Sequence, residues 1–140
     1  MARSVVPFKR WHYDWLGPAA EGAAPVRVPE DMLAAMEAAY SRTMIVDGEI
    51  VCCVGSVTPW PGRHCVWAYM SPKSAAHLLW ITRESLKLAA TLEGRLELTV
   101  RADFAAGHRW AKLLGFEVEA PMLRDYGPAG EDHVGYVRMN

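Results

Sequence analysis

Hydrophobic and polar residues alternate along several short segments of the chain, and this alternation predicts β-strands. The clearest case is the stretch from Arg42 to Val57, in which two β-branched runs flank Asp47-Gly48. Asp-Gly is a favoured two-residue hairpin turn, because both positions of that turn need positive φ. By the same patterns, further strands are predicted at residues 3–8, 64–70, 95–101, 116–123 and 133–139.

Three other segments carry apolar residues at helical spacing. The first covers residues 30–40, where two acidic residues lie at the positive end of the helix dipole. The second covers residues 71–94, with Ser71 as its N-cap, a proline at its first position and a glycine at its end. The third covers residues 103–114 and begins with Asp103 as its N-cap.

The order of these elements predicts an α/β fold of the α+β kind, with a mixed central sheet of six to seven strands and helices on both faces. Residues 64–70 are apolar on both sides of the strand, which is typical of a central strand. Because a long helix separates this strand from residues 95–101, we expect the two strands to lie parallel. The Pro/Gly/Ala-rich stretch Gly17 to Pro29 is too short to separate domains, so residues 1–140 should form one domain.

Composition narrows the possible partners and the cellular location. A net charge of −1 argues against a nucleic-acid or anionic-membrane surface, since no cluster of Lys and Arg is present to replace counterions. The apolar runs are far shorter than the ~20 residues of a membrane span. An odd number of cysteines without a C-x-x-C motif or a secretory signal predicts reduced thiols in the cytoplasm. Because Cys52, Cys53 and Cys65 lie in predicted strands, we expect unreactive core thiols.

The element order and two longer phrases resemble the GNAT acyltransferase family. The hairpin "IVDGEIVCCVGSV" is typical of that family's second and third strands. The phrase "LELTVRADFAAGHRWAKLLGFEVEA" resembles its fifth strand, its fourth helix and its terminal "GF" turn. The resemblance covers Arg42 to the C-terminus, and the first forty residues by element order only. It implies a GNAT-like fold and, in an active member, acetyl-CoA bound after the fourth strand.

The turn that would hold the cofactor departs from the family pattern. In the family, a turn of the form R/Q-x-x-G-x-G/A offers backbone N–H groups to the pyrophosphate at a helix N-terminus. The resemblance assigns this role to a turn without glycine, formed by Met70, Ser71, Lys73, Ser74, Ala75 and Ala76. We expect the N–H groups and the dipole of the helix start to remain, although the glycines that permit close approach are missing. Two interpretations are open: Lys73 and Ser74 contact phosphate, or Ser71 simply caps a helix and Lys73 is solvated.

A second departure concerns the proton donor. The family places an Asn after the fifth strand and a Tyr in the fourth helix, where the Tyr protonates the departing thiolate. The corresponding positions here hold Phe104 and Ala111, and neither side chain has a proton to give. The two departures together imply a degenerate site. We therefore expect no cofactor, with acetyl-CoA as the cofactor if the chain is an enzyme.

Three residues are candidates for acid–base chemistry. His64, at the edge of the fourth strand, and His133, near the C-terminal loop, suit the deprotonation of an ammonium group near neutral pH. Tyr69 shares a strand face with Trp67, and the pair lines either an acceptor cleft or the core. No metal site is expected, because the sequence contains no H-x-x-x-H motif and no paired Cys/His spacing.

Two functions remain as hypotheses. The aromatic fourth strand, the glycine-poor helix start and the basic–aromatic "HRWAKLLGF" resemble small GNAT-like proteins of tailed phages that are linked with internal virion proteins and assembly. This resemblance implies a virion-associated or assembly role with protein partners, in the host cytoplasm and in the virion. The alternative is an active acetyl-CoA-dependent N-acyltransferase whose amine substrate attacks directly in a ternary complex. Fold alone does not separate the two.

Overall fold

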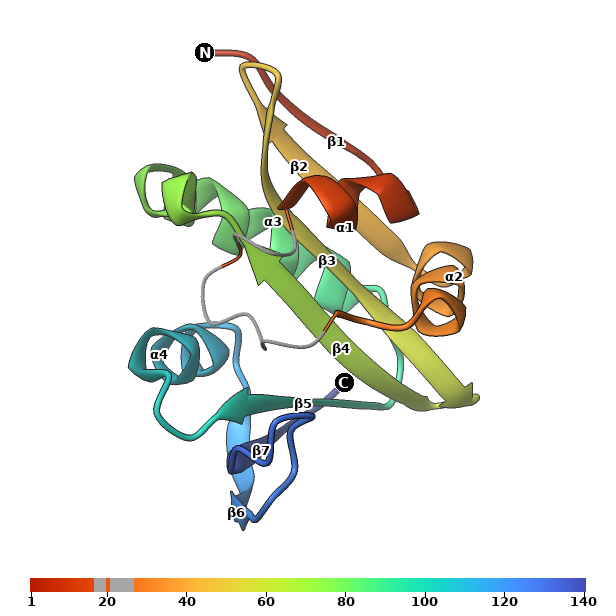
Figure 1. The fold of residues 1–140 in the computed structure, drawn as a ribbon, viewed down its shortest axis with the longest axis vertical. Helices are drawn as coiled ribbons and strands as arrows, with labels where there is room; N and C mark the ends of the chain where they lie inside the picture. The colour runs from red at the N-terminus through yellow and green to blue at the C-terminus, as the bar shows by residue number, and fades with distance from the viewer. Residues whose placement is uncertain (17–19, 21–26) are drawn as a thin grey trace.

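The computed structural model describes residues 1–16, 20 and 27–140. Within these residues, seven strands form one mixed sheet in the order β1-β2-β3-β4-β5-β7-β6 (Figure 1). Their bounds are β1 Arg3–Pro7, β2 Ser41–Val46, β3 Glu49–Trp60, β4 Arg63–Met70, β5 Arg95–Arg101, β6 Glu117–Leu123 and β7 His133–Met139. The predicted mixed sheet is confirmed, and β4 is its central strand.

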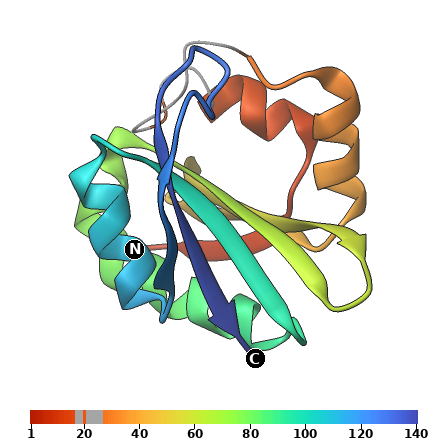
Figure 2. The same cartoon turned by 90° about the horizontal axis from the view of Figure 1, so that it is seen from below.

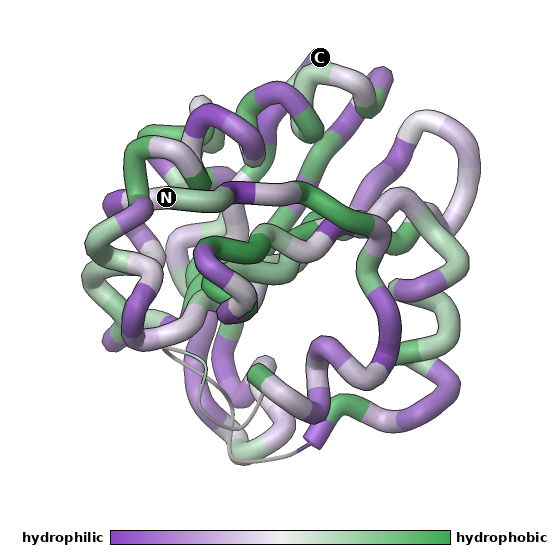
Figure 3. Tube along the Cα trace, turned by 90° about the horizontal axis from the view of Figure 1, so that it is seen from above, coloured by the Kyte–Doolittle hydropathy of each residue, from purple (hydrophilic) through white to green (hydrophobic). Residues whose placement is uncertain are grey.

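Helices cover both faces of the sheet, as predicted. Their bounds are α1 Arg10–Leu16, α2 Glu30–Ala38, a 3₁₀ helix η2 Pro72–His77, α3 Leu78–Ala90 and α4 Ala105–Leu113. Helices α1 and α2 lie on one side of the sheet and α3 and α4 on the other (Figure 2). Hydrophobic stretches follow the strands between the two layers of helices (Figure 3).

One helix was missed by the prediction, and the starts of two predicted helices need correction. Helix α1 was not predicted, because "RWHYDWL" mixes aromatic and polar residues without a helical period. The helix expected over residues 71–94 begins with the 3₁₀ turns of η2 and becomes α-helical only at Leu78. Phe104, and not Asp103, occupies the N-cap position of α4, while Asp103 accepts a hydrogen bond from Arg101 Nε at 2.6 Å. Most of the predicted loop at residues 17–29 lies outside the described residues.

The predicted hairpins are present. Asp47 and Gly48 have φ values of 48° and 79° in the tight turn between β2 and β3. Strand β3 extends to Trp60, three residues beyond the predicted end, because pairing with β4 resumes at Trp60 and Arg63 after a register shift. Gly62, with φ of 89°, lies in the turn of this second hairpin.

The crossover between β4 and β5 is also confirmed. The two strands pair in parallel, and helix α3 connects them. Leu96, Leu98 and Val100 of β5 share one face and pack in one cluster with residues of α3 and α4, as their alternation predicted. Leu96 is completely buried in that cluster.

A buried histidine joins helix α1 to the sheet. His12 Nδ1 accepts a hydrogen bond from the Lys9 backbone N–H at 3.0 Å and lies 2.8 Å from Thr43 Oγ1 on β2. Burial lowers the pKa of His12 below its ordinary 6.5, Glu37 opposes that shift, and Lys9 adds to it. Because Nδ1 accepts a hydrogen bond from the Lys9 N–H, the fold requires the neutral form of the imidazole.

Truncating the central core residue of β5 should be costly. We expect Leu96→Ala to lower the free energy of unfolding by about 2–5 kcal/mol, because the cavity beneath α3 and α4 cannot collapse completely. The control is Leu113→Ala on the exposed side of α4, which should change it by less than about 0.5 kcal/mol. Urea denaturation measures both values. Equal effects of the two substitutions would contradict the described core.

Lowering the pH should destabilise the fold by protonating His12, at pH values above those at which carboxylates become protonated. The folded-state pKa lies below 6.5, so the unfolded chain binds this proton more readily, and stability falls as pH drops below 6.5. The loss ends once the pH is below the folded-state pKa. We expect the urea midpoint of the wild type to fall between pH 7.5 and pH 5, and His12→Gln to remove that part of the decrease. An unchanged wild-type midpoint over this range would contradict the role of His12.

Candidate functional site

Strands β4 and β5 pair at one end and separate toward the other. Their parallel register joins Arg63 with Arg95, His64 with Leu96, and Cys65 with Glu97. Beyond these three pairs, β4 and β5 do not pair with each other. Figure 1 shows the two strands meeting near the β3–β4 hairpin and separating toward their C-terminal ends. The separated edges leave backbone N–H and C=O groups that an extended ligand can pair with.

An ion network holds the strands together where they do pair. Glu97 of β5 accepts hydrogen bonds from Arg63 Nε at 2.9 Å and from Arg95 Nε at 2.6 Å. The Arg63 hydrogen bond, followed by that of Arg95, lowers the pKa of Glu97 to about 2. Arg95 also pairs with Glu119 on β6. The network ties β4, β5 and β6 together at the closed end.

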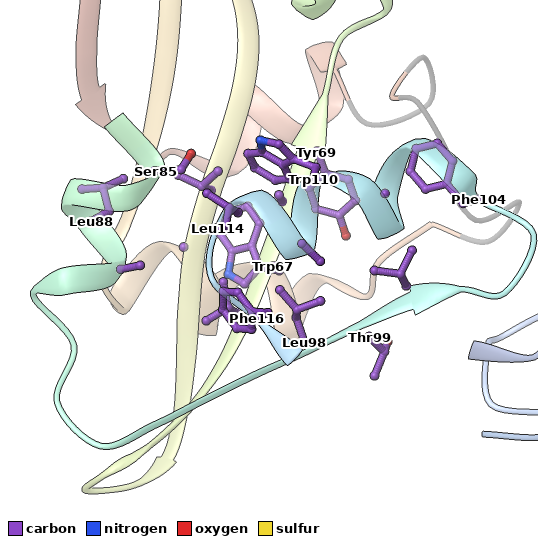
Figure 4. A pocket seen from close by; sticks show the side chains of 18 of the residues that line it. Trp67, Tyr69, Ser85, Leu88, Leu98, Thr99, Phe104, Trp110, Leu114 and Phe116 are labelled. Atoms are coloured by element: carbon purple, nitrogen blue, oxygen red, sulfur yellow. The ribbon is translucent and has the colours of Figure 1, made fainter. Parts of the chain in front are cut away.

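A cleft of about 240 Å³ occupies the space between the separated strands. Figure 4 shows side chains from β4, β5, α3 and α4 around this space. Strand alternation divides the lining into two parts. We call the part facing α3 and α4 the apolar chamber, lined by Val66, Ala68, Ser85, Leu88, Ala89, Leu92, Leu98, Val100, Phe104, Trp110, Ala111 and Leu114. We call the part on the opposite sheet face the polar rim, formed by Trp67, Tyr69, Thr99, Arg101, Glu131 and His133.

Two of the three predicted acid–base residues line this cleft. Tyr69 and His133 both belong to the polar rim. His64 lies instead at the closed end, where its Nδ1 is 3.0 Å from Thr58 Oγ1 and its Nε2 is 2.9 Å from the Glu93 carbonyl oxygen. A ligand in the cleft can therefore contact Tyr69 and His133 but not His64. The catalytic roles themselves stay predictions.

His133 is held between two polar neighbours. Its Nδ1 lies 2.9 Å from Thr99 Oγ1, and its Nε2 lies 3.6 Å from Glu131 Oε1. Hydrogen bonds from the backbone N–H of Glu131 itself and from that of Ala129 hold the pKa of Glu131 below its usual range. An ionised carboxylate next to the imidazole suits a base that must accept a proton. The sequence did not indicate Glu131, because it lies in the irregular loop "RDYGPAGED".

Tyr69 is a neutral phenol at physiological pH. Burial, followed by the neighbouring Tyr13 and Cys53, raises the pKa of Tyr69 to about 12. Its ring packs edge-on to Tyr13 with 5.3 Å between centroids, and it tilts against Trp67 at 5.7 Å. The Trp67–Tyr69 pair packs against the core, as one interpretation predicted, and it also lines the cleft. That the cleft receives an acceptor stays a prediction. A neutral phenol can donate a proton but is a poor base.

Ser71 caps the turn between β4 and α3, as one of the two interpretations predicted. Ser71 Oγ accepts from the Lys73 N–H at 3.1 Å, and the Ser71 carbonyl accepts from the Ser74 N–H at 2.9 Å. Pro72 has no N–H, and in a 3₁₀ helix each following N–H bonds to the carbonyl three residues before it. The N–H groups of this turn are thus occupied within the chain.

The side chains of the turn also lie apart from the cleft. None of the predicted cofactor-binding residues lines the cleft. These residues are Met70, Ser71, Lys73, Ser74, Ala75 and Ala76. Lys73 Nζ pairs with Glu49 Oε2 at 2.9 Å on an exposed surface. Ser74 is buried, while Ala75 and Ala76 are exposed. The phosphate-binding role of these residues stays a prediction.

Phe104 lies at the start of α4 and Ala111 lies within α4, as predicted from the sequence. Phe104 stands at the start of α4 and lines the apolar chamber. Ala111 is buried within α4 against the β5 cluster. Trp110, one residue earlier, uses its Nε1 to donate to Thr82 Oγ1 at 3.0 Å. The α4 side of the chamber therefore offers apolar surface and, at these positions, no ionisable group.

The three cysteines show no sign of nucleophilic activation. Burial raises the pKa of Cys52 well above its ordinary value and that of Cys53 to about 12. Burial and the nearby Glu97 carboxylate raise the pKa of Cys65. All three thiols are therefore protonated near neutral pH, as expected for unreactive thiols. Cys52 and Cys53 lie in the core as predicted, whereas Cys65 is only partly buried, so the predicted core position is wrong for Cys65.

Two kinds of feature are absent from the part of the chain that the structure describes, a metal-binding cluster and a membrane-spanning helix. Nowhere in it do three His, Cys, Asp or Glu side chains gather closely enough to hold a metal ion. No helix within it is both long and apolar enough to cross a membrane.

Comparison with known proteins connects this geometry to solved structures. No family model matches the sequence, and no curated protein matches it. The fold is similar to Ard1 from Thermoplasma volcanium, with a TM-score of 0.79 and 14% identity over 99% of this chain and 97% of that one. It is similar to Arabidopsis thaliana Naa50 in complex with the bisubstrate analogue CoA-Ac-MVNAL, with a TM-score of 0.76 and 12% identity over 100% of both chains.

A third similar structure is an acetyltransferase of the GNAT family from Streptococcus pneumoniae, with a TM-score of 0.71 and 12% identity over 99% of this chain and 100% of that one. The seven-stranded mixed sheet with helices on both faces is thus a GNAT fold, as the sequence resemblance implied. At these identities the likeness is one of fold alone.

The cap and the lysine of the β4–α3 turn should differ in their effect on stability. We expect Ser71→Ala to cost about 1 kcal/mol, because the Lys73 N–H loses its acceptor at a buried helix start. Lys73→Ala should leave the melting temperature within experimental error, because its ion pair is exposed. Thermal unfolding followed by circular dichroism measures both. A larger loss for Lys73→Ala than for Ser71→Ala would contradict the described turn.

Proposed function

We propose that this chain is a GNAT-fold protein with a degenerate acetyl-CoA site, which acts by binding other proteins during the assembly of a phage virion. The observation that carries the proposal is the closed β4–α3 turn. Its first position is a proline, and the next two N–H groups bond to Ser71. A pyrophosphate at this place would meet no free backbone donor from these three positions.

The energies favour weak binding. The dipole of a helix start contributes only ~0.3–1 kcal/mol toward an anion at an exposed site. Without donated hydrogen bonds, that amount does not offset the loss of hydration of a pyrophosphate. Lys73, the nearest cation of the turn, already neutralises Glu49. At position 111, helix α4 also lacks a proton donor for a departing thiolate, because Ala111 stands where the family has its tyrosine.

Exposed aromatic side chains support a role in binding proteins. Trp11 and Trp15 of α1 are 59% and 71% exposed, and their spacing of four residues places them on one helix face. Large aromatic residues are enriched where protein interfaces bury their central contacts. We propose this α1 face as the partner-binding surface. The phage setting, in the host cytoplasm and in the virion, rests on the resemblance of the glycine-poor turn and the "HRWAKLLGF" helix to small phage proteins.

A second candidate function is an acetyl-CoA-dependent N-acyltransferase. It is favoured by the open cleft, which brings Tyr69 and His133 to one rim, and by the fold shared with the Naa50 complex. In that reaction His133 would take a proton from the attacking amine, directly or through water. The amine nitrogen would bond to the thioester carbonyl carbon, and the carbon–sulfur bond would break. Tyr69, a neutral phenol, would supply the proton to the departing thiolate.

Calorimetry with acetyl-CoA separates the two functions. We expect no saturable heat at ligand concentrations up to about 1 mM, because the turn offers the pyrophosphate no free donor. The variants are Lys73→Ala and, as a matched control, Lys87→Ala, whose exposed ammonium group also pairs with a carboxylate, that of Glu84, at 3.1 Å. A micromolar dissociation constant that Lys73→Ala abolishes and Lys87→Ala preserves would overturn the degenerate site and favour the transferase.

The partner-binding surface has its own test. In a phage-infected host, the tagged chain should copurify with capsid and tail proteins, quantified by mass spectrometry. Substituting both Trp11 and Trp15 by Ser should reduce that recovery at least tenfold. Trp60→Ser serves as the control, because Trp60 is 57% exposed on the distant β3–β4 hairpin. Equal recovery for the double variant and the wild type would exclude the α1 face as the binding surface.

A further inference from the structure

The sheet has two edge strands, and they differ in how regular a backbone edge they offer. Strand β6 pairs with β7 through two register shifts and contains Pro121, which has no N–H to donate. Strand β1 pairs with β2 in one regular antiparallel register from Arg3 to Pro7. No strand lies beyond β1 in the part of the chain that the structure describes, and Figure 1 shows β1 at the outer margin of the sheet.

The pairing of β1 with β2 determines which backbone groups face outward. The Ala2 carbonyl accepts a hydrogen bond from the turn after β2 at 2.8 Å, and the Phe8 N–H donates to the first residue of β2 at 3.3 Å. Successive residues of a strand turn their backbone groups to opposite sides, so Arg3, Val5 and Pro7 turn theirs away from β2. The free edge therefore offers the N–H and C=O groups of Arg3 and Val5 and the C=O of Pro7.

The side chains along this edge combine an apolar centre with positive ends. Val5 is 38% exposed in the middle of the strand. The Arg3 guanidinium lies over the Trp80 ring, 5.3 Å from its centroid, so Arg3 and Val5 both point toward the α3 side. Lys9 is exposed just beyond the other end of β1. Side chains of an added strand would lie beside this row, with an apolar residue next to Val5.

The charges decide what kind of strand can be added. Neither Arg3 nor Lys9 forms an ion pair with any described residue. The carboxylates of Asp47 and Glu37, which lie next to these two ends, accept hydrogen bonds from backbone N–H groups at 2.8 and 2.7 Å. In an antiparallel pair of two copies, the Arg3 end of one β1 would lie beside the Lys9 end of the other. Cations would then face cations, whereas an acidic strand would be attracted.

We propose that the free edge of β1 binds an extended acidic segment of another protein, which adds a strand to the sheet. Backbone hydrogen bonds to Arg3 and Val5 hold the segment. Both strands rise by about 3.3 Å per residue, so acidic residues about six positions apart reach Arg3 and Lys9 together, with β-branched residues between them beside Val5. The surface involves neither the cleft, the β4–α3 turn nor the exposed face of α1, so the proposal is independent of the proposed function.

A palindromic peptide tests the proposal whichever way the added strand runs. The probe is Glu-Thr-Val-Thr-Val-Thr-Glu with blocked ends and a dye label, and the control is the same peptide with lysine in place of both glutamates. Binding is followed by fluorescence anisotropy at low salt, about 50 mM. We expect the glutamate peptide to bind at least tenfold more tightly than the lysine peptide. Equal affinities, or no saturable binding of the glutamate peptide, would overturn the proposal.

Charge reversal locates the binding to the ends of β1. Arg3→Glu should weaken the glutamate peptide about fivefold, whereas Arg109→Glu, the same change of charge on the exposed side of α4, should leave it unchanged. The double variant Arg3→Glu with Lys9→Glu should prefer the lysine peptide, which reverses the order of the wild type. A gain of function of this kind does not arise from a damaged fold. An unchanged order of the two peptides in the double variant would overturn the proposal.

The backbone hydrogen bonds have a separate readout. The Val5 N–H faces away from β2, so Val5→Pro removes an outward donor without breaking a bond to β2. We expect this variant to bind the glutamate peptide at least fivefold more weakly and to keep the melting temperature of the wild type. Sedimentation of the protein alone tests the other occupant. A dimer that Val5→Pro dissociates would assign the edge to a second copy and overturn the proposal.

Methylation of the peptide backbone distinguishes strand pairing from loose electrostatic contact. A paired strand turns alternate N–H groups toward its neighbour. One peptide therefore carries N-methyl groups on its two valines, and the other carries them on its first two threonines. We expect one of these peptides to lose binding and the other to keep it. Equal retention or equal loss in the two peptides would show that no strand is added, and would overturn the proposal.

Discussion

The structure depends on one feature of its sheet, the separation of two parallel strands after only three paired residues. Arg63 and Arg95, both bonded to Glu97, hold β4 and β5 together at the closed end. Beyond that point the strands diverge, and side chains from α3 and α4 line the gap. The cleft, and the position of Tyr69 and His133 on its lining, follow from this divergence. A sheet paired along its whole length would have no such space at its centre.

The degenerate cofactor site that we propose has two unlike ends. The cleft that would hold an acyl arm is open and apolar, while the turn that would hold its phosphates is closed by its own hydrogen bonds. Ser71 caps η2, and the 3₁₀ turns occupy the N–H groups that an α-helix start would leave free. On this proposal, a ligand that depends on phosphate contacts would find little support at the turn.

Much of the fold could be predicted because its local signals were strong. Asp47-Gly48 fixed a hairpin, and the long helix before Arg95 required a parallel crossover. Helix α1 escaped prediction, because aromatic and polar residues alternate there without a helical period. The candidate site was predicted only in part. Tyr69 and His133 had the right chemistry, but Glu131 lies in a loop, and only the folded chain shows that His64 is at the closed end. The expectation that the N–H groups of this turn remain available was wrong, because Ser71 and Pro72 are compatible with an α or a 3₁₀ start, and the 3₁₀ start that forms occupies them.

The most direct test of this account is a titration of the isotope-labelled protein with acetyl-CoA, followed by the backbone amide resonances of Lys73 and Ser74. These two N–H groups are bonded to Ser71 in the structure. If the turn is closed, their chemical shifts stay constant up to about millimolar acetyl-CoA. Saturable shifts at Lys73 and Ser74 on addition of acetyl-CoA would show that the turn opens to bind phosphate, and would contradict the account.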